Sequence, residues 1–132
     1  MVKRFKDWKA PVIKHGEFTK WFWLVWHPKT LTLGEQTDIG AFTYINALYG
    51  VEIGDGVEIA SHCSIYSVST IDGKTGKVVL GENCKIGSHS TIMPGVTIGR
   101  GAVVGAHSFI NKDIPPGVIA FGVPAKVIRK KS

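Results

Sequence analysis

Residues 86–99 read IGSHSTIMPGVTIG and place isoleucine at positions 86, 92 and 98. A spacing of six suits neither the 3.6-residue period of an α-helix nor the simple alternation of one strand. The same register runs through much of the chain, and its members are Leu33, Ile39, Ile45, Ile53, Ile59, Ile65, Leu80, Ile86, Ile92, Ile98, Val104 and Ile110. An aliphatic residue at every sixth position is typical of a parallel β-helix, in which short strands stack coil upon coil. Three hexads make one triangular coil, so the register predicts four coils that begin at Leu33, Ile53, Leu80 and Ile98.

A second column of small residues follows the aliphatic column four positions later. These residues are small enough to share a narrow interior with the aliphatic side chains, and they are Thr37, Thr43, Val57, Cys63, Ser69, Cys84, Ser90, Val96, Ala102 and Ser108. Both cysteines fall in this column at different corners, and the chain has no CxxC spacing. We therefore expect two small buried thiols and no disulfide.

Interruptions of the register predict how the single domain is organised. A short insertion lies near residues 49–52, and a longer one over 71–79 predicts a loop that leaves the prism, where function often resides. We expect an N-terminal cap over residues 1–32, the β-helix coils over 33–114 and a C-terminal tail over 115–132. The predicted fold class is thus all-β: a parallel β-helix of about four coils with a cap and a short tail.

Charge and hydropathy bound the partners and the compartment. The net charge of +6 favours anionic partners. Because the basic residues gather at the two ends and no helix-turn-helix, zinc-finger or RNP-type motif occurs, we expect no nucleic-acid binding. No signal-peptide apolar region is visible, and the longest apolar run, residues 21–26, is far too short to span a bilayer. We therefore expect a cytoplasmic protein.

The N-terminal segment FTKWFWLVWHPKT, residues 18–30, is rich in aromatic residues. It is apolar on both faces of a strand, so burial on both sides is expected. We favour a cap over the first coil, because an uncovered β-helix end exposes strand edges. The alternative is a membrane-surface anchor, since tryptophan beside lysine suits lipid headgroups.

Three segments of the C-terminal part of the chain form a specific combination: MPGVTIG at 93–99, NKDIPPG at 111–117 and GVPAKVI at 122–128. With them the chain resembles the hexapeptide-repeat acyltransferases, most closely the branch with the galactoside and maltose O-acetyltransferases. The resemblance implies a left-handed β-helix, an exception to the right-handed crossover rule. It also implies a homotrimer with active sites between subunits and acetyl-CoA as donor. We expect the acceptor to be a hydroxyl or amino group of a surface-polysaccharide or nucleotide-linked sugar, and we expect no metal.

The same resemblance assigns a coenzyme A site position by position. Ser88 and the backbone at Ala106 match residues along the pantetheine arm. Four further residues match those near the adenosine phosphates, and they are Asn111, Lys112, Lys126 and Arg129. Cations suit this place because a 3′-phosphate and a pyrophosphate bind charged donors strongly.

The acceptor pocket departs from the family's pattern. Thr70 stands where the O-acetyltransferases carry their catalytic histidine, and Lys85 stands where they carry a tryptophan. Their acceptor-binding asparagine falls near Phe42, although Asn46 lies close by. We expect Asn46, Thr70 and Asp72 to contact the acceptor; the alternative for the run from Asp72 to Gly76 is an ordinary solvent turn, whose composition it has.

Three histidines offer a replacement for the missing base. His62, His89 and His107 each lie three residues after an aliphatic of the register, so they form one outer column headed by Phe42. We predict His62 as the general base, because it shares a coil with the divergent segment, and His89 as the second candidate. The alternative is a structural column that fills a corner or a trimer interface. An amine acceptor would depend less on a base, since an amine with a pKa of about 8 is partly neutral at pH 7.

Two other functions remain open on this fold. A zinc enzyme of the γ-carbonic-anhydrase kind would bind its metal through histidines across a trimer interface. That family uses a closely spaced histidine pair, which this sequence lacks. A non-catalytic β-helix would serve as a scaffold or bind ice, but the outer columns show no regular threonine ladder.

Overall fold

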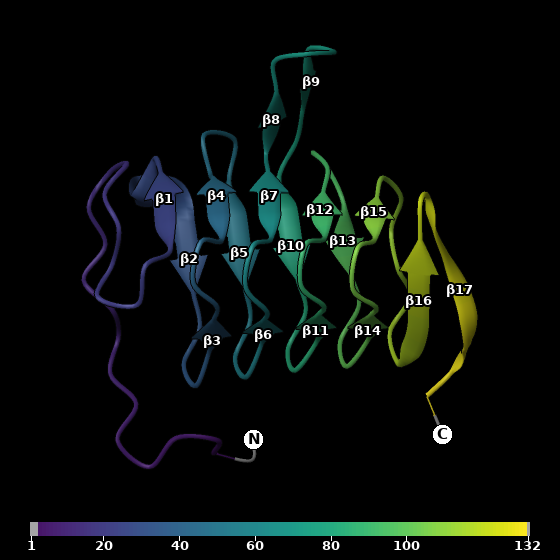
Figure 1. The fold of residues 1–132 in the computed structure, drawn as a ribbon, viewed down its shortest axis with the longest axis horizontal. Helices are drawn as coiled ribbons and strands as arrows, with labels where there is room; N and C mark the ends of the chain where they lie inside the picture. The colour runs from purple at the N-terminus through teal and green to yellow at the C-terminus, as the bar shows by residue number, and fades with distance from the viewer. Residues whose placement is uncertain (1–2, 132) are drawn as a thin grey trace.

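The computed structural model describes residues 3–131, which wind into a three-sided parallel prism (Figure 1). Sheet A contains β1 (Leu24–Trp26), β4 (Tyr44–Asn46), β7 (Ser64–Tyr66), β12 (Thr91–Ile92) and β15 (Phe109–Ile110). Sheet B contains β2 (Leu31–Leu33), β5 (Val51–Ile53), β10 (Val78–Leu80) and β13 (Thr97–Ile98). Sheet C contains β3 (Asp38–Ile39), β6 (Glu58–Ile59), β11 (Lys85–Ile86), β14 (Val103–Val104), β16 (Val118–Gly122) and β17 (Ala125–Lys130).

The hexad register sets the strand pairing. In sheet A, for example, Ile45 pairs with Ile65, Ile65 with Ile92, and Ile92 with Ile110. Every aliphatic of the register is buried except Leu33, which packs against the core in the first coil. Full burial of such a side chain is worth about 1.5–3 kcal/mol, so this stacked interior supplies the main stabilisation of the prism.

The second column of small residues is also buried, with one exception. Ser69 was predicted in the interior but lies half-buried in β8 (Val68–Ser69). Ser67 is fully buried instead, and its hydroxyl donates to the carbonyl of Asn46 over 2.7 Å. The reason for the error is that the chain leaves the prism directly after Ser67, earlier than the register break indicates.

The long insertion folds as a hairpin. Strands β8 and β9 (Lys74–Thr75) pair antiparallel and project from the prism beyond the end of β7 (Figure 1). The chain rejoins the prism at Val78, whose side chain is buried at the start of β10.

Both ends of the prism extend beyond the predicted coils. Strand β1 continues sheet A within the predicted cap, and β16 continues sheet C within the predicted tail. Ile114 bridges to Ile98, so a partial coil follows the four complete ones. A 3-10 turn, η1 (Pro28–Thr30), links β1 to β2.

The aromatic N-terminal segment is only half covered. Trp23 and Val25 are buried against the first coil, as expected of a cap. Trp21, Phe22 and Trp26 are 50%, 58% and 40% exposed, so the prediction of burial on both sides is wrong for the single chain. Within residues 3–131, no helix is long and apolar enough to cross a membrane.

Candidate functional site

Three histidine rings stack along the corner between sheets C and A. The ring centroids of His62 and His89 lie 4.8 Å apart with planes inclined by 2°. Those of His89 and His107 lie 4.8 Å apart with planes inclined by 13°. Phe42 heads the column, 5.2 Å from His62. The outer column expected from the sequence is therefore present, and all four side chains are exposed.

Each ring of this column projects from a left-handed turn. The φ angles of Phe42, His62, His89 and His107 are 64°, 61°, 60° and 59°. This conformation costs a residue other than glycine about 1–2 kcal/mol. Stacking of the rings offsets part of that cost, at about 0.5–1.5 kcal/mol per pair. A glycine would fit each corner without strain, so the rings supply what glycine cannot: a continuous imidazole face toward solvent.

Peptide hydrogen bonds hold the column in register. Each histidine N–H donates to a carbonyl of the coil before it, at distances of 3.0, 3.2 and 2.8 Å for His62, His89 and His107. The accepting residues are Ala41, Ser61 and Ser88. Each accepting residue directly precedes Phe42 or a histidine of the stacked column. A second column, which includes Ser88 and Ala106 and is predicted to border pantetheine, therefore lies beside the imidazole face.

A buried row of small side chains supports this corner from inside, and its members are Thr43, Cys63, Ser90 and Ser108. The hydroxyls of Ser90 and Ser108 both donate to the carbonyl of Gly105, over 3.2 and 2.7 Å. Burial raises the pKa of the Cys63 thiol, against weaker lowering by backbone hydrogen bonds. Burial also raises the pKa of Cys84 to about 12. Both cysteines are free and buried, as predicted, so neither thiol is suited to act as a nucleophile.

The residues predicted to contact the acceptor lie on the far side of β7 from His62. His62 precedes β7, whereas Thr70 and Asp72 belong to the hairpin that follows it (Figure 1). Both are exposed. A hydrogen bond from the Ser69 side chain lowers the pKa of Asp72, and the Lys74 N–H donates to the same carboxylate over 3.3 Å. Asp72 is thus satisfied within its own turn.

Asn46 lies beside two tyrosines that the sequence analysis did not select. Its side-chain amide donates to the Tyr44 hydroxyl over 3.3 Å, and the Tyr44 and Tyr66 rings lie 5.6 Å apart. All three are half-buried on the outer face of sheet A. Each residue flanks a core isoleucine of the register, and this flanking position is the signal that could have identified the tyrosines as outward-facing.

Two of the predicted phosphate-binding cations share one face because of a β-bulge. Strand β17 runs antiparallel to β16, with Lys126 opposite Phe121 and Arg129 opposite Ile119. The register shifts between Ile119 and Ala120. Lys126 and Arg129 are three positions apart on β17, but because of this shift their partners on β16 are only two positions apart. Without this shift, Lys126 and Arg129 would point to opposite faces.

Phe121 links these cations to the histidine corner. It is 53% exposed, and a methyl group added at Gly105 would lie 2.8 Å from its Cβ, which shows how closely it packs on the turn before Ala106. Lys126 therefore lies one side chain away from Ala106. Sequence reasoning missed Phe121, because only the pairing of β16 with β14, which puts Ala120 opposite Val104, brings Phe121 next to Gly105.

Asn111 and Lys112 lie apart from the other predicted coenzyme A residues. Both are exposed and follow β15, whereas His107 precedes it, so a strand separates them from the histidine column. The next residue, Asp113, accepts a hydrogen bond from the Thr97 N–H over 2.8 Å. A single chain thus brings Ser88, Ala106 and Lys126 toward one corner and leaves Asn111 and Lys112 at another.

No metal site accompanies the histidine column. In the part of the chain that the structure describes, no three His, Cys, Asp or Glu side chains are placed to hold a metal ion. The stacked rings are parallel, so their in-plane nitrogen lone pairs do not converge on a shared point. The γ-carbonic-anhydrase alternative therefore gains no support from the geometry of one chain.

Known proteins share this repeat and this fold. The profile "Bacterial transferase hexapeptide (six repeats)" matches residues 77–112. The chain carries the hexapeptide repeat of the bacterial transferases. This hexapeptide-repeat chain is 40% identical to the galactoside O-acetyltransferase of Escherichia coli (strain K12) over 118 residues, 78% of this chain and 58% of that protein. The resemblance stated from the sequence is thereby confirmed.

Solved structures agree with this relationship. A maltose O-acetyltransferase from Clostridium difficile 630 aligns with a TM-score of 0.78 and 31% identity, over 83% of this chain and 64% of that one. A mutant of AntD, an N-acyltransferase from Bacillus cereus in complex with dTDP-4-amino-4,6-dideoxyglucose and coenzyme A, aligns with a TM-score of 0.69 and 25% identity, over 87% and 80%. The predicted left-handed parallel β-helix is confirmed. The hexapeptide-repeat chain spans less than two thirds of the length of the galactoside and maltose enzymes.

Proposed function

We propose that this chain transfers an acetyl group from acetyl-CoA to a hydroxyl or amino group of a sugar. The observation that carries the proposal is the exposed imidazole column beside Ser88 and Ala106, on a repeat 40% identical to a galactoside O-acetyltransferase. Crystal structures of a galactoside acetyltransferase and of AntD contain coenzyme A. In this proposal the protein is a cytoplasmic enzyme that uses acetyl-CoA as donor and requires no metal.

The donor would lie along the corner between sheets C and A. Ser88 and the backbone at Ala106 would border the pantetheine arm, and Phe121 would offer an apolar surface next to them. Lys126 and Arg129, which the bulge turns to one face, would bind phosphate groups. Charge-assisted hydrogen bonds from such cations are about twice as strong as neutral ones. Asn111 and Lys112 would complete the phosphate site from another copy of the chain.

His62 would act as the general base. The acceptor O–H or N–H gives its proton to a neutral imidazole nitrogen, and the acceptor oxygen or nitrogen bonds to the acetyl carbonyl carbon. The carbon–sulfur bond then breaks, and the coenzyme A thiolate takes up the proton. His62 is favoured over His89 because His89 is stacked between two histidines, whereas His62 has a histidine on one side only.

The active site would require more than one copy of the chain. Asn46 and the hairpin residues Thr70 and Asp72 are separated from His62 by β7, so a small acceptor that touches both sets must lie between two copies. A homotrimer supplies three such clefts, since a heterologous contact that closes on itself repeats the same pair of surfaces. Asn46, with Tyr44 and Tyr66, would bind the acceptor from the outer face of sheet A.

The test is release of the coenzyme A thiol from acetyl-CoA, measured with a panel of sugars and of amino sugars, free and nucleotide-linked. On a hydroxyl acceptor, His62→Ala should lower turnover by about 10²–10⁴-fold, the usual value of a general base. An amino acceptor should lose much less, because part of the amine is already uncharged.

His89→Ala is the matched control, since it removes a ring from the same stack. We expect it to change turnover far less than His62→Ala on the hydroxyl acceptor. Full activity of His62→Ala on a hydroxyl would transfer the role to His89. Absence of thiol release with every acceptor, together with no binding of coenzyme A, would reject the acetyltransferase and favour a scaffold.

A further inference from the structure

The first 29 residues concentrate two kinds of side chain that the acetyltransferase proposal does not use. All four tryptophans of the chain lie here, at positions 8, 21, 23 and 26. Residues 3–29 also contain seven Lys and Arg against two acidic residues, so their net charge is +5 of the +6 of the whole chain. The tryptophans are thus confined to one end of the prism, far from β17, and this end also carries most of the net charge (Figure 1).

A tight turn presents the exposed aromatic side chains of this segment. The Thr19 N–H donates to the Trp23 carbonyl over 2.8 Å, and the Phe22 N–H donates to the Thr19 carbonyl over 2.9 Å. Thr19 and Trp23 are buried, which fixes the base of the turn. Phe18, just before the turn, and Trp21 and Phe22 within it are 54%, 50% and 58% exposed, and these three side chains form the apolar tip. The apolar tip is therefore a fixed and exposed feature of the cap, and its two phenylalanines lie beside Phe42, with ring centroids 6.0 Å from it for Phe18 and 6.5 Å for Phe22.

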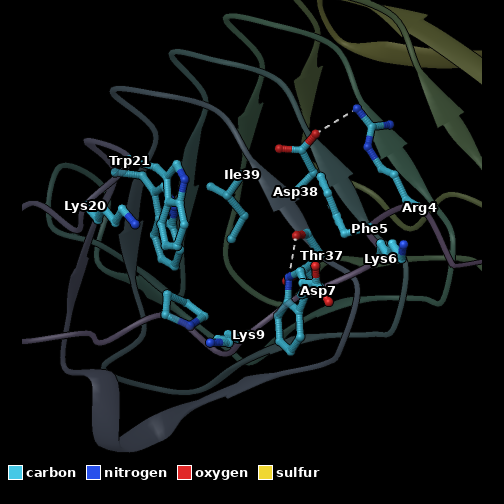
Figure 2. A pocket seen from close by; sticks show the side chains of 13 residues that line it. Arg4, Phe5, Lys6, Asp7, Lys9, Lys20, Trp21, Thr37, Asp38 and Ile39 are labelled. Atoms are coloured by element: carbon cyan, nitrogen blue, oxygen red, sulfur yellow. Dashed lines mark hydrogen bonds and ion pairs between the residues drawn. The ribbon is translucent and has the colours of Figure 1, made fainter.

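Three lysines that form no ion pair within the described part of the chain line a cavity that Trp21 of the tip also borders. A cavity of about 750 Å³ lies between the N-terminal arm and the first coil, and Lys6, Lys9 and Lys20 line it together with Trp21 (Figure 2). Among residues 3–131, none of these three lysines forms an ion pair, whereas Arg4 is paired with carboxylates of sheet C. The ammonium group of Lys20 lies 5.4 Å from the Trp21 ring centroid. These charges are available to an anionic partner.

We propose that this end of the molecule docks on an anionic membrane surface. The tip of Phe18, Trp21 and Phe22 would enter the boundary between headgroups and acyl chains, where tryptophan is favoured. Lys6, Lys9 and Lys20 would contact lipid phosphates. A second copy of the same patch is a poor occupant, because each copy would bring the same three cations, Lys6, Lys9 and Lys20, to the contact. Binding would be peripheral and reversible.

The chain contains its own probe for this contact. Since every tryptophan lies in residues 8–26, intrinsic fluorescence reports only on the N-terminal end. Addition of vesicles of equal parts phosphatidylcholine and phosphatidylglycerol should shift the emission to the blue, and the protein should sediment with them. Vesicles of phosphatidylcholine alone should bind far less, and salt should release the protein. Each lysine near an anionic surface contributes about fivefold in affinity, so Lys6→Gln/Lys9→Gln should bind about 25-fold more weakly.

Matched variants separate the patch from general effects of charge and hydrophobicity. Phe18→Ala/Trp21→Ala should weaken vesicle binding by at least about tenfold, whereas Leu48→Ala/Tyr49→Ala, an exposed apolar pair elsewhere, should not. Arg100→Gln/Lys130→Gln removes equal charge at the other end and should have little effect. Equal binding of both vesicle types, no binding at all, or binding unchanged in the Lys6/Lys9 variant would overturn the proposal. If Phe18→Ala/Trp21→Ala changes the oligomeric mass but leaves vesicle binding unchanged, the proposal is also overturned, and the tip is a contact between copies of the chain.

Discussion

Replacing Gly99 by alanine tests how closely the coils approach each other. Gly99 follows β13 and is buried, and its φ angle is not in the left-handed region. A Cβ added there would lie 2.2 Å from the Pro116 nitrogen and 2.6 Å from the Pro115 carbonyl carbon. Real Cβ atoms do not approach backbone this closely, so the last coil would have to move away from the prism.

The size of the effect follows from the hydrogen bonds that this movement would break. Three join the last coil to the one before it near this site: from Gly99 to Ile114 over 2.7 Å, from Ile114 to Thr97 over 3.0 Å, and from Gly117 to Arg100 over 2.9 Å. At about 1 kcal/mol for each bond, Gly99→Ala should lower the free energy of unfolding by about 3 kcal/mol. The melting temperature should fall by about 10 °C for a chain of this size.

Gly101→Ala is the control within the same turn. A Cβ at Gly101 would meet nothing within 4 Å, but its φ of 70° is left-handed, so only backbone strain of about 1–2 kcal/mol is expected. Urea unfolding followed by circular dichroism, at one fixed protein concentration, would compare the two variants. If Gly101→Ala is as damaging as Gly99→Ala, close approach of the coils is not what requires glycine at position 99.

Further predictions concern the corner, the tail, the thiols and the assembly. His62→Gly should be more stable than His62→Ala by about 1 kcal/mol in urea unfolding, because glycine alone relieves the left-handed strain; equal stabilities would contradict this account of the turn. The double variant Lys126→Ala/Arg129→Ala should bind coenzyme A more weakly when binding is measured by calorimetry, with the larger loss at low salt. Unchanged affinity would show that these two residues do not bind the phosphates. The two cysteines should resist a thiol reagent at neutral pH until urea unfolds the chain, since burial raises the pKa of both; rapid labelling of native protein would show that the interior is open. Light scattering should give three times the chain mass of 14.3 kDa, and an active monomer would refute a site shared between copies.

Much of the prism follows from the sequence because a β-helix repeats one local rule. Ile65 and Ile92 lie one coil apart and pair directly, as their shared register predicts. The same counting placed His62, His89 and His107 at one corner, where their rings do stack. A period identifies neighbours across coils because the rise from coil to coil is fixed by the hydrogen bonds between strands, about 4.8 Å.

The departures have physical causes that a period does not contain. The register shows where an aliphatic resumes after an insertion, but not where the chain leaves the prism, so Ser69 was placed inside and Ser67 was overlooked. The sequence shows that Trp21 and Phe22 are apolar, but it does not show whether this chain or another surface covers them. The bulge that turns Lys126 and Arg129 to one face depends on pairing with β16, which hexad counting does not describe.

Strand β17 also protects the molecule from polymerisation. A parallel prism ends in a row of open backbone groups on each sheet, and such an edge can template a second prism end to end. On sheet C this row is occupied, because β17 folds back antiparallel on β16 and becomes the outermost strand. Three of its six residues, Lys126, Arg129 and Lys130, are cationic, so approaching copies repel each other along this edge. The side chains proposed to bind phosphates therefore also keep sheet C from growing into a filament.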